Sequence, residues 1–278
     1  MERKQQVTHI GDLAHEAAGG KTLDEMRRAE AEYLNKRLQA GAATSPEAAE
    51  ALQKYWQGVF AEKPAQVSLL MVTRRTAQEM DYDEARRKFW AILQMRAAHI
   101  AINSGNPEFK WQFSEKEAAQ IANLLRYFIN DPAGQYPLTK GLFVYGAPGT
   151  GKTEVMQALA RFTQEYDLTK RFEFVSMSAV YDSARKGADE ITTQEQQDRC
   201  FDEFGRITGT VLQYGNPIDL NESILEARYI RHQRYGQLTH LITNATPNST
   251  KQMFTPAMYD RIRTMCTGVP FVGPSKRK

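Results

Sequence analysis

The chain has 278 residues, of which 41% are hydrophobic and 25% charged, with a formal net charge of +3. This is ordinary globular composition, with room for one large domain or two smaller ones, and the charge is too close to neutral to indicate nucleic-acid binding by itself. The two cysteines are too few for a disulfide framework or a zinc site, and no run approaches the roughly 20 apolar residues of a membrane helix, so we expect a cytoplasmic protein with reduced thiols and no membrane partner.

The first part of the chain is expected to be helical and to form a domain of its own. Residues 1–20 are small and polar and are expected to form a mobile tail. Residues 21–105 contain three helical patterns, of which the last covers about 76–103 and ends at the Ser-Gly-Asn-Pro segment 104–107. The larger aromatic residues here are interpreted as the core of a small domain rather than as a partner surface: Trp56, Phe60, Phe89 and Trp90.

Residues 109–278 alternate between apolar runs and helical patterns. Ser114 and Glu117 form a capping box that opens a helix, and Asn221 is expected to cap a later one. The segments 192–197 and 206–220 show no clear period. Strands are expected at 141–145, 172–176, 199–202, 238–243 and 269–272. This alternation predicts an α/β fold in which a parallel five-stranded sheet has helices on both faces.

The segment after the first of these strands carries the strongest chemical signal. It reads Gly146, Ala147, Pro148, Gly149, Thr150, Gly151, Lys152 and Thr153. This is the spacing G-x-x-x-x-G-K-[ST], placed between a predicted strand and a predicted helix. The glycines let backbone N–H groups turn toward a phosphate, and the helix N-terminus adds a partial positive charge. We therefore expect ATP here, with Lys152 on its β- and γ-phosphates and the Thr153 hydroxyl on Mg²⁺; the alternative is a glycine turn that binds no nucleotide.

Two acids and an amide follow later strands of the predicted sheet. Asp202 and Glu203 end the third strand, where ligands bind in open α/β sheets. We assign Asp202 to the metal and Glu203 to the attacking water, with an exposed acidic turn as the alternative. Asn244 ends the fourth strand and is expected to contact the γ-phosphate or position the water, unless it merely terminates the strand. The aromatic cluster around Trp111 is interpreted as packing between domains rather than as an adenine site.

Together these segments resemble the DnaC-type replicative helicase loaders, which are AAA+ P-loop ATPases with the IstB-type transposition helpers as close relatives. The resemblance covers about 109–278, and residues 1–105 match no motif. It is carried by Gly146–Thr153, Asp202-Glu203, Ile224–Tyr229, Ile242–Asn244, Tyr259–Ile262 and Phe271–Arg277. Only 34 residues follow Asn244, which is too few for the helical lid of most AAA+ proteins, and the loaders are similar in lacking it.

The resemblance also implies roles for particular residues. Asn244 would be the sensor on the fourth strand. Arg261, with Arg263 behind it, would reach the ATP of a neighbouring subunit, although Ala257 occupies the usual place of that arginine. Arg277 would act on the ATP of its own subunit. The alternative for each arginine is a surface ion pair.

The function implied is an ATPase that loads a replicative helicase. Its N-terminal domain would dock on a hexameric helicase, and ATP would lie between subunits of a homo-oligomer that binds single-stranded DNA. Basic residues that could line a DNA path are Arg185, Lys186, Arg231 and Arg234. The alternatives are an ATPase that recruits a transposase, a nucleotide switch that does not hydrolyse ATP, and a small-molecule kinase.

Overall fold

The computed structural model describes residues 77–213, 216–245, 249 and 253–276. Its centre is a five-stranded sheet with the order β2-β3-β6-β1-β7, in which every neighbouring pair is parallel. The strands are β1 (Gly141–Tyr145), β2 (Glu173–Ser176), β3 (Arg199–Asp202), β6 (Thr239–Thr243) and β7 (Cys266–Pro270). The parallel five-stranded sheet expected from the sequence is therefore confirmed.

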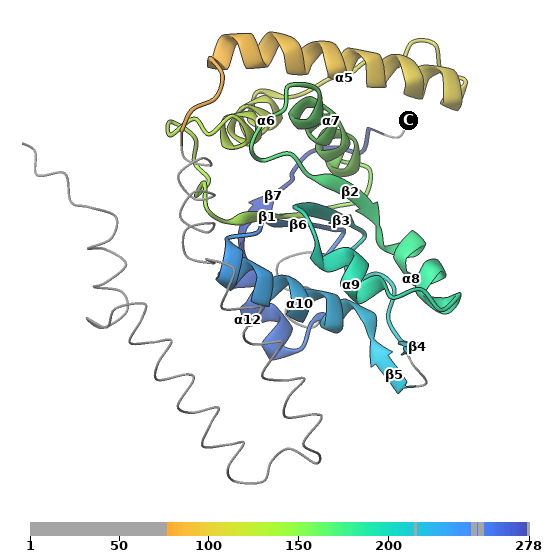
Figure 1. The fold of residues 1–278 in the computed structure, drawn as a ribbon. Helices are drawn as coiled ribbons and strands as arrows, with labels where there is room; N and C mark the ends of the chain where they lie inside the picture. The colour runs from red at the N-terminus through yellow and green to blue at the C-terminus, as the bar shows by residue number, and fades with distance from the viewer. Residues whose placement is uncertain (1–76, 214–215, 246–248, 250–252, 277–278) are drawn as a thin grey trace, which may run out of the picture. The chain divides into compact units, whose positions relative to one another are not determined.

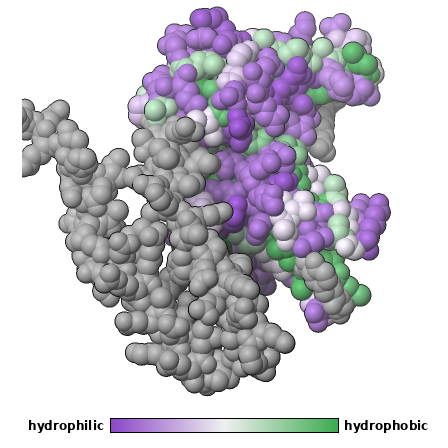
Figure 2. Space-filling view, viewed as in Figure 1, coloured by the Kyte–Doolittle hydropathy of each residue, from purple (hydrophilic) through white to green (hydrophobic). Residues whose placement is uncertain are grey.

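Helices cover both faces of this sheet (Figure 1). One layer consists of α5 (Tyr82–Ser104), α6 (Glu115–Phe128) and α7 (Lys152–Glu165). On the other side lie α8 (Met177–Arg185), α9 (Glu190–Glu195), α10 (Leu220–Tyr235) and α12 (Pro256–Met265). In the view of Figure 2 the outer surface of the described elements is mostly hydrophilic, with scattered apolar residues.

The hydrophobic core is divided between the two faces of the sheet. On strand β1, which lies between β6 and β7, Leu142 and Val144 join the cluster formed by α5, α6 and α7, whereas Phe143 joins the cluster formed by α8, α10 and α12. Successive side chains of a strand point to opposite faces, so a strand covered on both sides has to be apolar throughout. This arrangement holds the end of β1, where the glycine-rich loop begins, rigidly between the two layers.

Helix α5 corrects the domain boundary that we expected after residue 105. Phe89 of α5 packs edge-on against Phe162 of α7 at 5.9 Å between ring centroids, and both rings are buried. Asp81 caps the helix, and Gly105 ends it in the left-handed conformation, as the Ser-Gly-Asn-Pro segment indicated. The helix therefore shares its core with α6 and α7. The buried residues of α5 recur at helical spacing, and this pattern does not show whether the helix packs in an N-terminal domain or against the sheet domain.

Several local expectations differ from the structure. The last strand begins at Cys266 rather than 269, because α12 passes into it without a turn residue, and its Pro270 is tolerated since β7 is an edge strand. The polar segment 192–197 overlaps α9, and 206–220 contains a hairpin of β4 (Thr210–Gln213) and β5 (Asn216–Asp219). Asp219, not Asn221, caps α10.

Part of the sequence analysis concerns residues outside the described ranges. These are the tail 1–20, most of the helical domain including Trp56 and Phe60, and Arg277. Both cysteines are described, and both are buried and free of disulfides. Among the residues that the structure describes, none of the helices is long and apolar enough to cross a membrane.

Candidate functional site

The glycine-rich loop joins β1 to α7 as a tight turn, and its glycines are required by their surroundings. Gly146 has φ +150°, and a Cβ there would lie 2.1 Å from the carbonyl oxygen of Phe271. Gly149 has φ +81°, and a Cβ there would lie 2.4 Å from Oγ of Ser275. A side chain at either position would therefore meet both backbone strain and the C-terminal segment.

Lys152, the first residue of α7, is buried against the loop that precedes it. Its Nζ donates hydrogen bonds to the carbonyl oxygens of Gly146 and Ala147, each at 2.8 Å. Thr150 Oγ1 donates to the same Ala147 carbonyl at 3.0 Å. The lysine charge is thus held at the N-terminus of α7, where the helix dipole also favours an anion.

Thr153 and Asp202 lie together, as the metal assignment requires. Thr153 Oγ1 lies 3.3 and 3.2 Å from the two carboxylate oxygens of Asp202. Burial raises the pKa of the Asp202 carboxyl, whereas hydrogen bonds from Thr153 and from the Glu203 backbone N–H lower it. A hydroxyl and a half-buried carboxylate at this spacing are the protein ligands that Mg²⁺ takes beside a bound phosphate.

Glu203 has an unusual backbone and an unexpected partner. Its φ is +59°, which is rare for a non-glycine residue and is often found at functional sites. Its carboxylate accepts a hydrogen bond from Nη1 of Arg206, an exposed side chain three residues later. Sequence reasoning missed Arg206, which lies in a segment without regular period. The Glu203 carboxylate, the candidate catalytic base, is therefore bound to an exposed arginine in this structure.

A single pocket of about 830 Å³ brings most of the predicted residues together. Its wall includes Lys152, Thr153, Asp202, Glu203 and Asn244, together with Pro148, Gly149 and Gly151 from the loop. The rest of the wall was not predicted as a site: Ile100, Ser104, Asn106, Phe109, Trp111, Glu154, Arg206 and Lys276. Three of these come from α5 and the turn after it, so the error in the domain boundary also concealed one wall of the pocket.

The C-terminal segment lies directly against the loop. The backbone N–H of Phe271 donates to the carbonyl oxygen of Tyr145 at 2.7 Å, and the backbone N–H of Lys276 donates to the carbonyl oxygen of Gly149 at 2.7 Å. Lys276 Nζ lies 2.7 Å from Oε1 of Glu117 in α6. Residues 271–276 are thereby fixed at both ends beside the pocket.

Trp111 has a packing role, but within one core rather than between two domains as we expected. Its ring stacks on Phe113 with centroids 5.4 Å apart, and its Nε1 donates to the Leu93 carbonyl of α5 at 3.1 Å. The same indole also borders the pocket beside Gly151. The cluster thus fixes α5 to the segment before α6 and contributes an apolar edge to the pocket.

Other predicted residues lie outside this pocket. Arg261 in α12 donates to Glu226 of α10 at 3.0 Å and does not line it. A residue that acts on a neighbouring subunit's nucleotide would lie away from its own pocket, so this role stays a prediction. Arg185 pairs with Asp182 on α8, and Arg231 donates to Gln237 beyond α10.

A buried arginine lies at the start of β3, at the opposite end of the strand from Asp202 and Glu203. Arg228 of α10 is fully buried, and burial lowers its pKa to about 10, so it is charged at neutral pH. Its guanidinium donates to Thr239 Oγ1 at 2.9 Å and to the carbonyl oxygen of Gln197 at 2.6 Å, among other carbonyls after α9. It therefore joins α10, β6 and the segment that leads into β3.

The chain was compared with known proteins: no family model and no curated protein matches it. Among solved structures it is similar to DnaI, with 15% identity and a TM-score of 0.46 over 62% of this chain and 89% of that one. A primosome component from Streptococcus pyogenes serotype M3 gives 15% identity and a TM-score of 0.45 over 59% of this chain and 84% of that one.

A DnaC helicase loader, the class of protein that the sequence motifs resemble, gives 15% identity and a TM-score of 0.43 over 58% of this chain and 94% of that one. A similarity of this extent concerns the fold alone, so a function for this chain has to come from the residues of its pocket.

Proposed function

We propose that the chain is an ATPase that binds ATP and Mg²⁺ in the pocket beside the glycine-rich loop. The observation that carries the proposal is the meeting of Lys152 and Thr153, at the start of α7, with Asp202 and Glu203, at the end of β3, in one pocket. If the glycine turn bound no ligand, its position next to two adjacent acids at the same edge of the sheet would have no function. The expected phosphate cradle and the expected acids come from segments about fifty residues apart in sequence.

Each side chain has a distinct role in this proposal. Lys152 would exchange its hydrogen bonds to the loop carbonyls for bonds to phosphate oxygens, which are stronger because both partners are charged. Thr153 and Asp202 would hold Mg²⁺, which neutralises phosphate charge when bound. Glu203 would orient and deprotonate water once its carboxylate leaves Arg206, and Asn244 would hold the water or the terminal phosphate.

We further propose that this ATPase serves DNA replication as a helicase loader. The support is the set of motifs that resemble DnaC-type loaders and the order of elements in the described part of the chain. In this proposal the N-terminal domain expected at residues 21–105 contacts the helicase through the part that precedes α5, ATP lies between subunits, and Arg261 reaches the ATP of the next subunit. Arg277, next to the pocket residue Lys276, would act on the ATP of its own subunit.

The nucleotide part of the proposal is tested by binding of a labelled ATP analogue with Mg²⁺. Lys152→Ala is expected to weaken binding about 100-fold, since a buried charged group on the phosphates is lost and tenfold in affinity corresponds to about 1.4 kcal/mol. Lys186→Ala, an exposed lysine at the end of α8, is the matched control and should bind like the parent. Equal affinity of the parent and Lys152→Ala would remove the basis of the proposal.

The DNA part is tested separately, with labelled single-stranded DNA and a non-hydrolysable ATP analogue. Binding that needs the analogue and weakens with salt supports a loader. Preference for duplex DNA would favour the transposition helper instead. No DNA binding in either nucleotide state, with ATP binding intact, would leave a nucleotide switch.

A further inference from the structure

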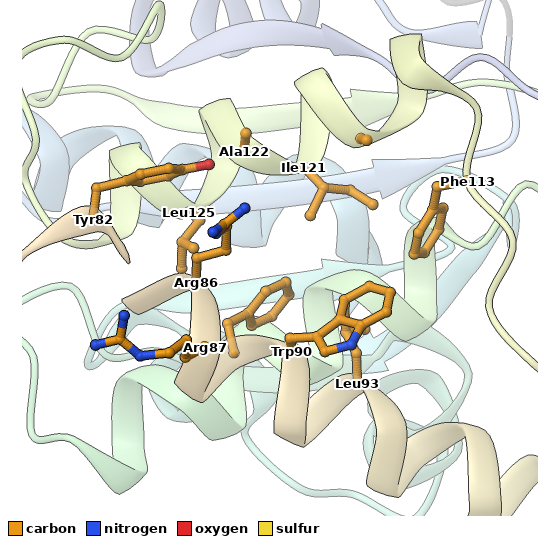
Figure 3. A pocket seen from close by; sticks show the side chains of 11 residues that line it. Tyr82, Arg86, Arg87, Trp90, Leu93, Phe113, Ile121, Ala122 and Leu125 are labelled. Atoms are coloured by element: carbon orange, nitrogen blue, oxygen red, sulfur yellow. The ribbon is translucent and has the colours of Figure 1, made fainter. Parts of the chain in front are cut away.

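A second hollow lies on the other half of α5, away from the pocket described above. It is a groove of about 440 Å³ between α5 and α6 (Figure 3). Its α5 wall carries Tyr82, Arg86, Arg87, Phe89, Trp90 and Leu93, and its other wall carries Phe113, Ala118, Ile121, Ala122 and Leu125. We call this the α5–α6 groove. Its residues do not enter the proposed ATPase mechanism.

The floor of the groove is apolar and preformed. Phe89, Leu93 and Leu125 are buried in the core beneath it, and their rings and methyl groups form the base of the hollow. Trp90 stands at the rim, with 45% of its surface exposed, and its ring meets Phe113 edge-on at 6.4 Å. A large exposed indole beside a hollow is the usual form of a contact residue, because it provides area at little entropic cost.

The chemistry of the walls favours an apolar side chain over a nucleic-acid base. The polar side-chain groups among the lining residues are all hydrogen-bond donors: the Tyr82 hydroxyl, the Trp90 indole N–H and the guanidinium groups of Arg86 and Arg87. The edge of a base carries several donors and acceptors, and most of them would lose water here without gaining a partner. A leucine or phenylalanine side chain would lose no hydrogen bond on entering.

The two arginines set the charge of the occupant. Both line the groove, Arg86 with its guanidinium beside Tyr82 and Arg87 at the outer edge (Figure 3). Arg86 makes a long, exposed ion pair with Asp83 at 3.6 Å, and across the described part of the chain Arg87 has no ion-pair partner. Carboxylates on an incoming segment would complement this positive edge, since guanidinium groups bind carboxylates in a fork geometry.

We propose that the α5–α6 groove binds a segment of a partner protein that carries a large apolar residue next to aspartate or glutamate, most simply an acidic amphipathic helix. Such helices bind grooves of this kind through their apolar face, while charged residues along the edge fix their register. The same helix α5 also borders the ATP pocket through Ile100 and Ser104, and its Arg96 donates to Glu154 of α7 at 2.9 Å. A partner in the groove would therefore rest on the helix that forms one wall of the nucleotide pocket.

The test selects short random peptides on the intact chain and then measures the affinity of the selected peptides. Three variants are compared with the parent: Trp90→Glu, Arg87→Glu and the control Met95→Glu. Met95 is the matched control because it lies on the same helix outside the groove, with 47% of its surface exposed. Circular dichroism and urea unfolding of each variant establish that the fold is retained.

The expected result is that the selected peptides share a large apolar residue flanked by acids. Their affinity should fall at least about tenfold in Trp90→Glu and in Arg87→Glu, and change less than about twofold in Met95→Glu. Peptides without acids, or peptides that bind all the variants equally, would overturn the proposal.

Two further controls exclude other occupants. Competition by single-stranded oligonucleotide that depends on Trp90 would show a nucleic-acid site instead. A Trp90→Glu variant that changes the sedimentation of the free chain would show that a second copy fills the groove. Either result, or the absence of any selected peptide that depends on Trp90, contradicts the proposal.

Discussion

The pocket beside the glycine-rich loop and the α5–α6 groove share one helix but are built in opposite ways. The pocket gathers cations, acids and an amide at the ends of parallel strands, and the loop residues that line it all lie within the stretch 148–153. The groove gathers apolar side chains from the faces of two helices. A phosphate cradle needs consecutive backbone N–H groups, so it leaves a local motif. An apolar groove needs only that two helices place apolar side chains on facing surfaces, so it leaves no local motif in the sequence.

This difference predicts that substitutions in the pocket should change ATP turnover and that substitutions in the groove should not. Glu203→Gln keeps the size of the side chain but removes the base, so ATP turnover should fall about 10²- to 10⁴-fold. ATP affinity should stay within about threefold, because the phosphates are held by Lys152 and the loop. Steady-state phosphate release and nucleotide binding measure the two effects.

Glu165→Gln, at the exposed end of α7, is the control for this prediction. Trp90→Glu, in the groove, should also keep full turnover in the absence of a partner. If Glu203→Gln hydrolysed ATP at the parental rate, the acids across from the loop would have another role.

The second prediction concerns Arg228, the buried arginine that joins α10, β6 and the segment leading into β3. Arg228→Met should lower the free energy of unfolding by about 3 kcal/mol or more, because several buried carbonyl oxygens lose their donor. Arg231→Met, one turn later on α10 and partly exposed, should change it by less than about 1 kcal/mol. Urea unfolding of the two variants gives the comparison. A small loss in Arg228→Met would mean that water replaces the guanidinium and that the segment leading into β3 does not depend on it.

The sequence predicts the pocket better than the groove, because only the pocket contains a local sequence motif. The strands β1, β3 and β6 were located, and Lys152, Thr153, Asp202, Glu203 and Asn244 do meet in one pocket, because the motif fixes the loop and the parallel topology fixes the edge of the sheet.

The features that the sequence did not predict depend on contacts between distant segments. Helix α9 is short and polar, and its C-terminal carbonyls are bound by Arg228 of α10. The place of α5 depends on Phe89 and Arg96 meeting α7, which its amphipathic pattern cannot specify. Arg206 and Lys276 line the pocket, but no motif in the sequence marks them as site residues.

A third prediction asks whether the C-terminal segment shapes the loop. Gly149→Ala should weaken ATP binding about tenfold, because its Cβ would press on Ser275 while the backbone is strained at φ +81°. Gly187→Ala is the matched control, since Gly187 has φ +91° but nothing within 4 Å of a Cβ. Both variants should lose about 1 kcal/mol of stability, and only Gly149→Ala should lose affinity.

Adding Ser275→Gly to Gly149→Ala removes the atom that the new Cβ would meet. The double variant should regain most of the affinity, although the backbone strain remains. If it binds ATP no better than Gly149→Ala alone, the strain at φ +81° is the whole effect and the segment 271–276 does not shape the loop.

The smallest expected effect concerns the ion pair that ties this segment to α6, the helix that also forms a wall of the groove. Burial raises the pKa of Glu117, but hydrogen bonds from Lys276 and Ser114 together hold it below the ordinary value of 4.5. A carboxyl whose pKa is lowered by folding adds stability above its unfolded pKa and loses it as the pH falls through the folded pKa. Lys276→Met should therefore be less stable than the parent by about 1 kcal/mol at neutral pH.

This gap should close in acid, because a protonated Glu117 has no charge to offer Lys276. Urea unfolding at about pH 7, 5 and 3.5 should show the full difference at the first two values and a reduced one at the third. If the gap were the same at all three values, Lys276 would be held by its 2.7 Å hydrogen bond to the Gln112 carbonyl and by packing on Phe113 rather than by the carboxylate. The C-terminal segment 271–276 would then be anchored to the segment before α6, independently of the charge on Glu117 of α6.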